Sequence, residues 1–320
     1  MIEWSQKISY RFAKGEMTNA HPRATEHIAY AQRERLAFIE VRSYFCGNLT
    51  RVHIEERFGV KPAASARDLI AYRALAPNNL QYNAALRCYQ PTAAFRPVFE
   101  HTPAHVLNWF RSGAGDGLEG ASVQAIPCEA AQDLVQPNLS MLATITRAIT
   151  AGTVIEVSYL SLTSGASIKR LAPLALADTG FRWHLRAYDQ AKNRFADFVL
   201  TRIESARSTQ ETIPEPQRLP HDAQWNRMVP LDLVTHPGIN HPAAIEADYG
   251  MTDGNLALSI RAPLVGYALK RWSVDCTADH SLSPKSHHLW LRNAKVLDGV
   301  ESAILAPGFT ASPDTSAAKA

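Results

Sequence analysis

A strictly alternating segment at residues 181–189 constrains the fold of this chain most. In an extended strand, successive side chains point to opposite faces. One face of the segment is apolar and predicts packing against a core; its side chains are Phe181, Trp183, Leu185 and Ala187. The other face is cationic, with no acid before Asp189; its side chains are Arg182, His184, Arg186 and Tyr188. Such a row on a rigid sheet favours an anionic ligand, a phosphate or a nucleic acid.

Length and composition predict a soluble protein of two or three domains. The chain has 320 residues, of which 46% are hydrophobic and 20% charged, values that are ordinary for globular proteins. No apolar run approaches a membrane span, and the N-terminus lacks the pattern of a signal peptide. The scattered cysteines form no CxxC pair; they are Cys46, Cys88, Cys128 and Cys276. Free thiols of this kind predict a reducing compartment, the cytoplasm, and no membrane partner is expected.

The charge distribution and two breaks suggest how the chain is divided. The net charge is +3, but residues 1–112 contain 15 Lys and Arg against 9 Asp and Glu. This excess points to a nucleic-acid contact there, and a solvated basic face, which commonly carries as much charge, is the alternative. Four glycines at 112–120 predict a flexible linker, and two prolines at 212–217 predict a stiffer one. The expected parts are 1–112, 113–212 (linker plus a β domain), 213–310, and a disordered tail at 311–320.

The first third is predicted to be a winged helix-turn-helix. Apolar spacing, caps and stop signals predict three helices and a hairpin at about 26–46, 51–58, 62–77 and 80–89. Phe38, Val41 and Phe45 fall at helical spacing in the first helix, and Leu69, Tyr72 and Leu75 are expected to point inward from the third. The third helix of this motif enters the major groove, where Arg67 suits guanine and Ser65 suits a base or phosphate. The alternative is a plain helical bundle in which Arg67 only solvates the surface.

The predicted DNA contacts come from the second helix, the third helix and the hairpin. Thr50 and Arg51 open the second helix, where backbone N–H groups and a cation commonly bind phosphate. The full set of predicted DNA-binding residues is Thr50, Arg51, Lys61, Ser65, Arg67, Tyr82, Arg87 and Tyr89.

The remaining two thirds change to a strand-rich pattern. In the middle, a helix at 138–151 precedes strands at 154–160, 166–171, 181–189 and 194–200, whose close spacing favours a small antiparallel barrel. The last third predicts a small α+β unit with strands at 243–251, 256–261 and 286–291 and a helix at 262–272.

The cationic row has a plain structural alternative, because its members can pair with Asp178, Asp189, Asp197 or Glu156. We favour a ligand site, since Arg170 and Arg202 can join the same side and outnumber the acids. Histidine pairs such as His101/His105 and His236/His241 lack further ligands at zinc spacing, so no metal is expected. Without a P-loop, GxGxxG or GxSxG motif, we expect no cofactor and no enzymatic activity.

Three segments carry a resemblance to a known family. Residues 182–189 resemble the motif that names the WYL domain, with His184 where tyrosine often stands, and 170–174 and 195–203 fit its neighbouring strands. Residues 58–82 resemble the winged helix of the WYL repressors found beside bacterial anti-phage systems of the BREX and CBASS types. Residues 245–267 are similar to their C-terminal dimerisation domain.

The resemblance implies a multidomain α+β fold: a winged helix-turn-helix, an Sm-like or SH3-like WYL barrel, and a small C-terminal dimerisation domain. It implies a homodimeric repressor that binds an inverted-repeat operator, in double-stranded DNA, of a defence operon. A nucleic-acid or nucleotide ligand on the WYL domain would release the operator. The implied ligand-binding residues are Tyr159, Ser161, Arg170, Arg182, His184, Arg186 and Arg202. Lys61 and Ala64 depart from the expected small cap and polar base-reading residue, so the operator sequence does not carry over.

Two alternatives keep the same architecture. One is a transcriptional activator. The other is a module whose WYL domain binds nucleic acid and regulates a partner enzyme.

Overall fold

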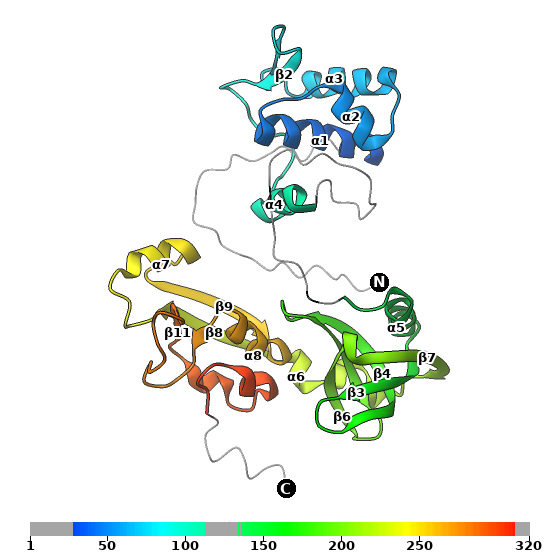
Figure 1. Ribbon diagram of the computed structural model, residues 1–320, viewed down its shortest axis with the longest axis vertical. Coiled ribbons are helices and arrows are strands. Elements are labelled where there is room, and N and C mark those ends of the chain that lie inside the picture. The colour runs from blue at the N-terminus through cyan, green and yellow to red at the C-terminus, as the bar shows by residue number, and fades with distance from the viewer. Residues whose placement is uncertain (1–27, 113–127, 129–133, 135, 311–320) are drawn as a thin grey trace. The chain divides into compact units, whose positions relative to one another are not determined.

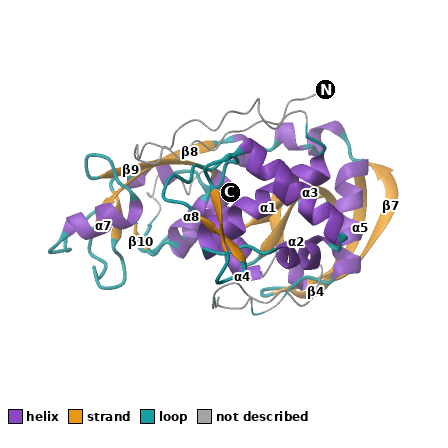
Figure 2. Ribbon diagram, turned by 90° about the horizontal axis from the view of Figure 1, so that it is seen from above, coloured by secondary structure: helices purple, strands orange, loops and turns teal. Residues whose placement is uncertain are grey.

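The computed structural model describes residues 28–112, 128, 134 and 136–310 (Figures 1 and 2). The linker and tail expected at 113–120 and 311–320 lie outside these residues. The chain divides into two compact units at the Gln132–Asp133 bond, so the middle and last thirds belong to one unit. No helix in the described ranges is long and apolar enough to cross a bilayer.

The N-terminal unit is a helical domain with a small hairpin. Its elements are α1 (Tyr30–Cys46), α2 (Arg51–Phe58), α3 (Pro62–Leu75), β1 (Leu80–Asn83), β2 (Cys88–Pro91) and α4 (Pro103–Ser112). The strands β1 and β2 pair antiparallel, with Tyr82 opposite Tyr89. The three helices and the following hairpin confirm the predicted winged helix-turn-helix.

Local signals explain where these helices begin and end. Gly47 and Gly59 adopt positive φ angles of 73° and 59°, a conformation that glycine reaches without steric cost, and each ends a helix. Thr50 caps α2 in a capping box with His53, whose Nδ1 accepts the Thr50 N–H at 3.2 Å. Pro62 opens α3, where its missing N–H costs no hydrogen bond.

The inner face of α1 includes polar residues as well as apolar ones. Val41 is buried and Phe38 is partly buried against the core, but Phe45, at the same helical spacing, is 39% exposed. Buried Glu40 and Ser43 share the inner face of α1 with Leu36 and Ile39. Apolar spacing alone could not reveal these polar positions.

The second unit begins with an antiparallel sheet covered by one helix. Its elements are α5 (Leu139–Ala151), β3 (Thr153–Ser161), β4 (Gly165–Asp178), β5 (Trp183–Asp189), β6 (Arg194–Val199), the 3₁₀ turn η2 (Leu200–Arg202) and β7 (Ile203–Thr212). The strand order is β6-β5-β4-β3-β7. The strand β7 was not predicted from the sequence, and this ladder does not confirm that the sheet closes into a barrel.

Burial along β5 follows the predicted alternation only in part. Leu185 and Ala187 are buried in the core between the sheet and α5. However, Phe181 and Trp183 are 52% and 46% exposed, so the apolar face does not enter the core along its whole length. His184 and Arg186, on the opposite face, are buried. The segment after the sheet supplies their cover.

The C-terminal part is a four-stranded sheet with helices. Its elements are η3 (Glu215–Gln217), η4 (Leu219–His221), α6 (Ala223–Asn226), β8 (Met228–Thr235), α7 (Pro242–Tyr249), β9 (Asn255–Arg261), α8 (Ala262–Arg271), β10 (Val274–Asp275), β11 (Leu289–Leu291), η5 (Ala294–Leu297) and η6 (Glu301–Leu305). The strand order is β10-β11-β8-β9, with β10 and β11 parallel. Val265 and Leu269 of α8 lie in one core with Leu231 of β8.

One predicted strand in this part is wrong. Residues 243–251 were expected to be extended, but most of them form α7. Pro242 at the first turn and Gly250 at the end, with φ 57°, are the start and stop signals of a helix. The alternating pattern was therefore outweighed by caps that the prediction ignored.

Candidate nucleic-acid and ligand sites

Three buried polar contacts fix the inner face of α3. Asp68 accepts hydrogen bonds from Arg35 Nε at 2.5 Å and from Gln32 Nε2 at 3.0 Å, both from α1. On α3, the Tyr72 hydroxyl donates a hydrogen bond to the carboxylate of Glu40, on α1, at 2.8 Å. Helix α3 is thus held on its side facing α1 by charge-assisted bonds, which are stronger than neutral ones.

Ser65 belongs to this inner face and not to the predicted DNA-reading face. Its side chain has no exposed surface, and its hydroxyl donates to Glu55 of α2 at 2.6 Å. Ser65 therefore has no access to a base or a phosphate. The prediction that it contacts DNA is wrong, because the helix is rotated so that this position packs against α2.

The outward face of α3 and the start of α2 carry exposed cations. Lys61, Arg67 and Arg51 are exposed, and Arg87 lies at the exposed turn of the hairpin. Within residues 28–112 as described, none of these four side chains forms an ion pair. The Arg67 Nε donates only to the Ala63 carbonyl of its own helix, at 3.2 Å. These charges are available to phosphate or to a guanine edge.

The hairpin presents an aromatic pair beside this helix. The Tyr82 and Tyr89 rings pack edge to face with centroids 5.1 Å apart, and Tyr82 is exposed. The guanidinium of Arg73, on α3, lies over the Tyr89 ring at 5.8 Å. Backbone hydrogen bonds between Leu49 and Tyr89 tie the hairpin to the start of α2. Tyr89 thus helps to attach the hairpin to α3 and to the start of α2, whereas the Tyr82 side chain is exposed.

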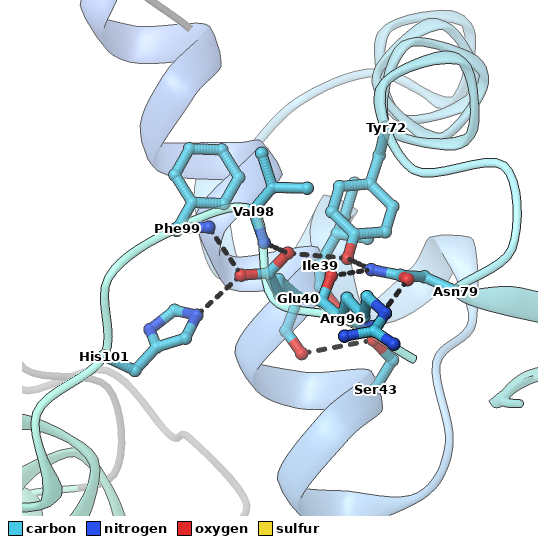
Figure 3. Close-up of polar contacts among 9 residues, drawn as sticks. All are labelled: Ile39, Glu40, Ser43, Tyr72, Asn79, Arg96, Val98, Phe99 and His101. Atoms are coloured by element: carbon cyan, nitrogen blue, oxygen red, sulfur yellow. Dashed lines mark hydrogen bonds and ion pairs between the residues drawn. The ribbon is translucent and has the colours of Figure 1, made fainter. Parts of the chain in front are cut away.

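Glu40 is the centre of a buried polar network that was not predicted from the sequence (Figure 3). Its carboxylate accepts hydrogen bonds from Tyr72 and from the backbone N–H groups of Val98 and Phe99, each at 2.8 Å. The His101 Nε2 lies 2.8 Å from the same carboxylate. Burial and the nearby Glu40 charge raise the pKa of Tyr72, so its phenol stays a donor. The network connects α1, α3 and the segment after the hairpin.

In the second unit, one cation of the predicted row, Arg186, is neutralised. Arg186 is buried and donates two hydrogen bonds to Asp222, at 2.7 and 2.9 Å. Its Nη1 also lies 3.2 Å from Asp197, the residue opposite it on β6. The prediction of a row free of countercharge is wrong for Arg186. Asp222 occupies the Nε–Nη2 edge of its guanidinium, so this edge is not open to a ligand.

Three more predicted ligand residues have other partners. Arg170 pairs with Glu211 at 2.5 Å on the exposed surface. Ser161 accepts hydrogen bonds from the backbone of Thr163 and Ser164 and so stabilises the β3–β4 turn. Tyr159 is buried in the core, where its hydroxyl accepts the Val199 N–H at 3.3 Å. Burial in the core therefore argues against a ligand contact by Tyr159, whereas ligand binding by Arg170 and Ser161 stays a prediction.

Arg182, His184 and Arg202 remain together at one end of β5. No carboxylate pairs with Arg182 or Arg202 among the residues that the structure describes. The His184 ring packs 5.0 Å from the ring of Tyr267, which α8 supplies. Burial and the charge of Asp197 raise the pKa of Tyr267, and the positive charges of Arg182 and Arg202 oppose that increase. Tyr267 could not be assigned to this cluster from the sequence, because it comes from a helix that packs on another sheet.

The environment of His184 predicts a dependence of stability on pH. Burial lowers the pKa of His184 from 6.5 to about 4, and the charges of Arg182 and Arg202 act in the same direction. Between these values the unfolded chain binds the proton and the folded chain does not, so stability falls as the pH falls from 6.5 towards 4. The loss amounts to about 3 kcal/mol. Urea denaturation measures the free energy of unfolding at pH 7.5 and at pH 5. The difference between the two values is expected to be smaller in His184→Tyr than in the wild type.

The control for this prediction is His221→Tyr, which changes a histidine that is half exposed. That variant is expected to keep the wild-type pH dependence. If His184→Tyr loses as much stability between pH 7.5 and pH 5 as the wild type, the acid sensitivity comes from other groups.

Comparison with known proteins identifies three domains along the chain. Family models match the BrxR winged helix-turn-helix domain at 31–112, the WYL domain at 140–208 and the BrxR C-terminal dimerization domain at 228–297. The DNA-binding transcriptional repressor CapW of Escherichia coli (strain KTE188) is 32% identical over 276 residues, covering 82% of this chain and 90% of that protein. The chain belongs to the CapW family.

Two other CapW repressors show the same extent of similarity. The Stenotrophomonas maltophilia protein is 29% identical, covering 84% of this chain and 91% of the relative. The Pseudomonas aeruginosa protein is 32% identical, covering 75% and 82%. The resemblance inferred from 182–189 and the flanking segments is therefore confirmed at the level of the CapW family.

Proposed function

We propose that this CapW-family chain is a DNA-binding transcriptional repressor whose affinity for its operator is controlled by a ligand. It acts in the cytoplasm as a homodimer on an inverted repeat, and it controls an anti-phage defence operon. The observation that carries the proposal is the presence of unpaired cations at two separate sites. One is the outward face of α3 with Arg67, and the other is the Arg182–Arg202 cluster.

The two sites suit two different anions. On duplex DNA, Arg67 would bond a guanine edge while Arg51 and Lys61 bond phosphates. On the WYL sheet, Arg182 and Arg202 would bind the phosphates of a nucleic-acid or nucleotide effector. An effector that binds better to the free dimer than to the DNA-bound dimer weakens operator binding through that difference alone.

Replacing Arg67 by alanine is expected to weaken binding to the upstream promoter DNA by roughly 10- to 100-fold, because a bidentate base contact is lost. Gel shifts with the duplex and with a scrambled duplex measure the effect. Arg147→Ala removes an exposed arginine of α5 and serves as the matched control. Equal affinity of the wild type for both duplexes would contradict operator recognition.

Replacing Arg182 and Arg202 together by alanine is expected to keep the operator complex intact when an effector is added. Short DNA and RNA oligonucleotides, titrated onto the preformed complex, should release the wild type and not the double variant. Arg207→Ala, which breaks an exposed pair with Glu156, is the control. Normal release of the double variant would remove these two residues from the effector site.

A reporter under the chain's own promoter separates repression from activation. Deletion of the gene is expected to increase expression, whereas decreased expression would favour an activator of the same build. Binding of single strands without binding of any upstream duplex would favour a module that regulates a partner enzyme.

A further inference from the structure

A cavity of about 330 Å³ lies between the WYL sheet and the C-terminal part, within the second unit. This volume is in the range of small-molecule sites. Its walls come from β5, β6, α6, α8 and η6, and the residues used below are Arg186, Phe195, Asp197, Tyr267, Glu301 and Ile304.

Tyr267 connects this cavity to the cation cluster. Its ring lines the cavity and also packs 5.0 Å from His184. Arg182 precedes His184 by two residues, and Arg202 lies in η2 directly after Val199, the residue that pairs with His184 on β6. A single ligand that contacts Tyr267 can therefore reach both the cavity and the two unpaired guanidinium groups.

The polar groups of the cavity include acceptors with unused capacity. Asp197 Oδ1 is buried and makes no hydrogen bond of good geometry in the described residues, although Arg186 lies 3.2 Å away. Burial raises the pKa of Asp197, while Arg186 opposes this increase, as expected for a carboxyl short of partners. Glu301 is exposed at the rim, and its backbone N–H donates to the Gln224 side chain at 3.2 Å. Phe195 and Ile304 add apolar surface.

We propose that the cavity and the Arg182–Arg202 cluster form one site for a guanine nucleotide. The base lies against Tyr267, its N1–H and N2–H donors face the carboxylates of Asp197 and Glu301, and the phosphate binds the two arginines. Guanine fits because it presents two neighbouring N–H donors, whereas the other bases present a single donor group at that edge. The proposal rests on the ligand-controlled repression proposed above and names the class of its effector.

Calorimetry on the full-length chain tests the site with dGMP, dAMP, dCMP, dTMP and inorganic phosphate as probes. We expect dGMP to bind about tenfold more tightly than the other nucleotides, and phosphate alone to bind more weakly than any of them. Glu301→Gln should abolish the preference for dGMP. Tyr267→Ala should weaken all four nucleotides by roughly 5- to 100-fold through lost stacking, and Tyr267→Phe should restore most of the affinity.

The control is Asp248→Asn, which makes the same carboxylate-to-amide change at an exposed position of α7 away from the cavity. Thermal melts show whether each variant is folded, and Glu301→Gln alters an exposed side chain without changing its size. Equal affinities for the four nucleotides, absence of nucleotide binding, or an unchanged dGMP preference in Glu301→Gln would each overturn the proposal.

Operator release distinguishes this inference from the proposed function. If oligonucleotides release the wild type and the Arg182/Arg202 variant resists them, while Tyr267→Ala and Glu301→Gln respond normally, the repressor proposal stands and the guanine site fails. If no probe releases wild-type protein from its operator, control by a nucleotide fails whatever the cavity binds.

Discussion

Replacing Arg186 by alanine is expected to lower the free energy of unfolding of the second unit by about 3–5 kcal/mol. The change leaves Asp222, which is buried, and the largely buried Asp197 without their cation. Removing one partner of a buried pair costs more than the pair itself contributes, because the remaining charge stays desolvated. Urea denaturation followed by circular dichroism measures the loss.

Arg207→Ala is the matched control for Arg186→Ala. Arg207 also pairs with a carboxylate from the same sheet, Glu156 at 2.7 Å, but its side chain is 68% exposed. The expected loss is below about 1 kcal/mol, since exposed pairs are screened by water. Similar losses for the two variants would show that Asp222 does not depend on Arg186. The large effect would also explain any loss of effector response in Arg186→Ala as a folding defect.

Replacing Glu40 by alanine is expected to lower the free energy of unfolding of the N-terminal unit by about 3–4 kcal/mol. The Tyr72 hydroxyl and the N–H groups of Val98 and Phe99 would lose their common acceptor. Hydrogen exchange of residues 95–101 should become faster, because this segment is bound to α1 through the same carboxylate. Denaturation and exchange mass spectrometry together measure both effects.

Glu34→Ala provides the comparison, since Glu34 is an exposed residue of the same helix. It is expected to change the unfolding free energy by less than about 0.5 kcal/mol. Tyr72→Phe should give an intermediate loss, because it removes one donor and leaves the carboxylate with its backbone partners. A Glu40→Ala protein as stable as Glu34→Ala would mean that water replaces the network without cost.

Short-range signals predicted the N-terminal fold well. The bounds of α2 follow from Thr50 and Gly59, which act within one helical turn, and the start of α3 follows from Pro62. The strands at 153–161 and 183–189 follow from alternation in the same way. Where two local signals disagreed, as in α7, the proline and glycine caps determined the structure.

Long-range pairing explains what the sequence did not reveal about the sites. Arg186 meets Asp222 across 36 residues, and Glu40 meets Phe99 across 59. Alternation correctly placed Arg186 and His184 on one face, but it carried no information on which segment covers that face. The rotation of α3 that buries Ser65 was also decided by packing against α2 and not by the helix itself.

The glycine turn between β4 and β5 has a practical consequence. At Gly180, with φ 74°, a Cβ atom would lie 1.9 Å from the guanidinium of Arg271, so the last residue of α8 rests directly on this turn. Arg271, Tyr267 and Asp222 together make the WYL sheet dependent on the C-terminal part of its unit. A protein truncated after residue 212 would expose the charge of Arg186 and the His184 ring to solvent. If this truncated protein failed to bind an effector, the result would not test the effector site of the intact chain.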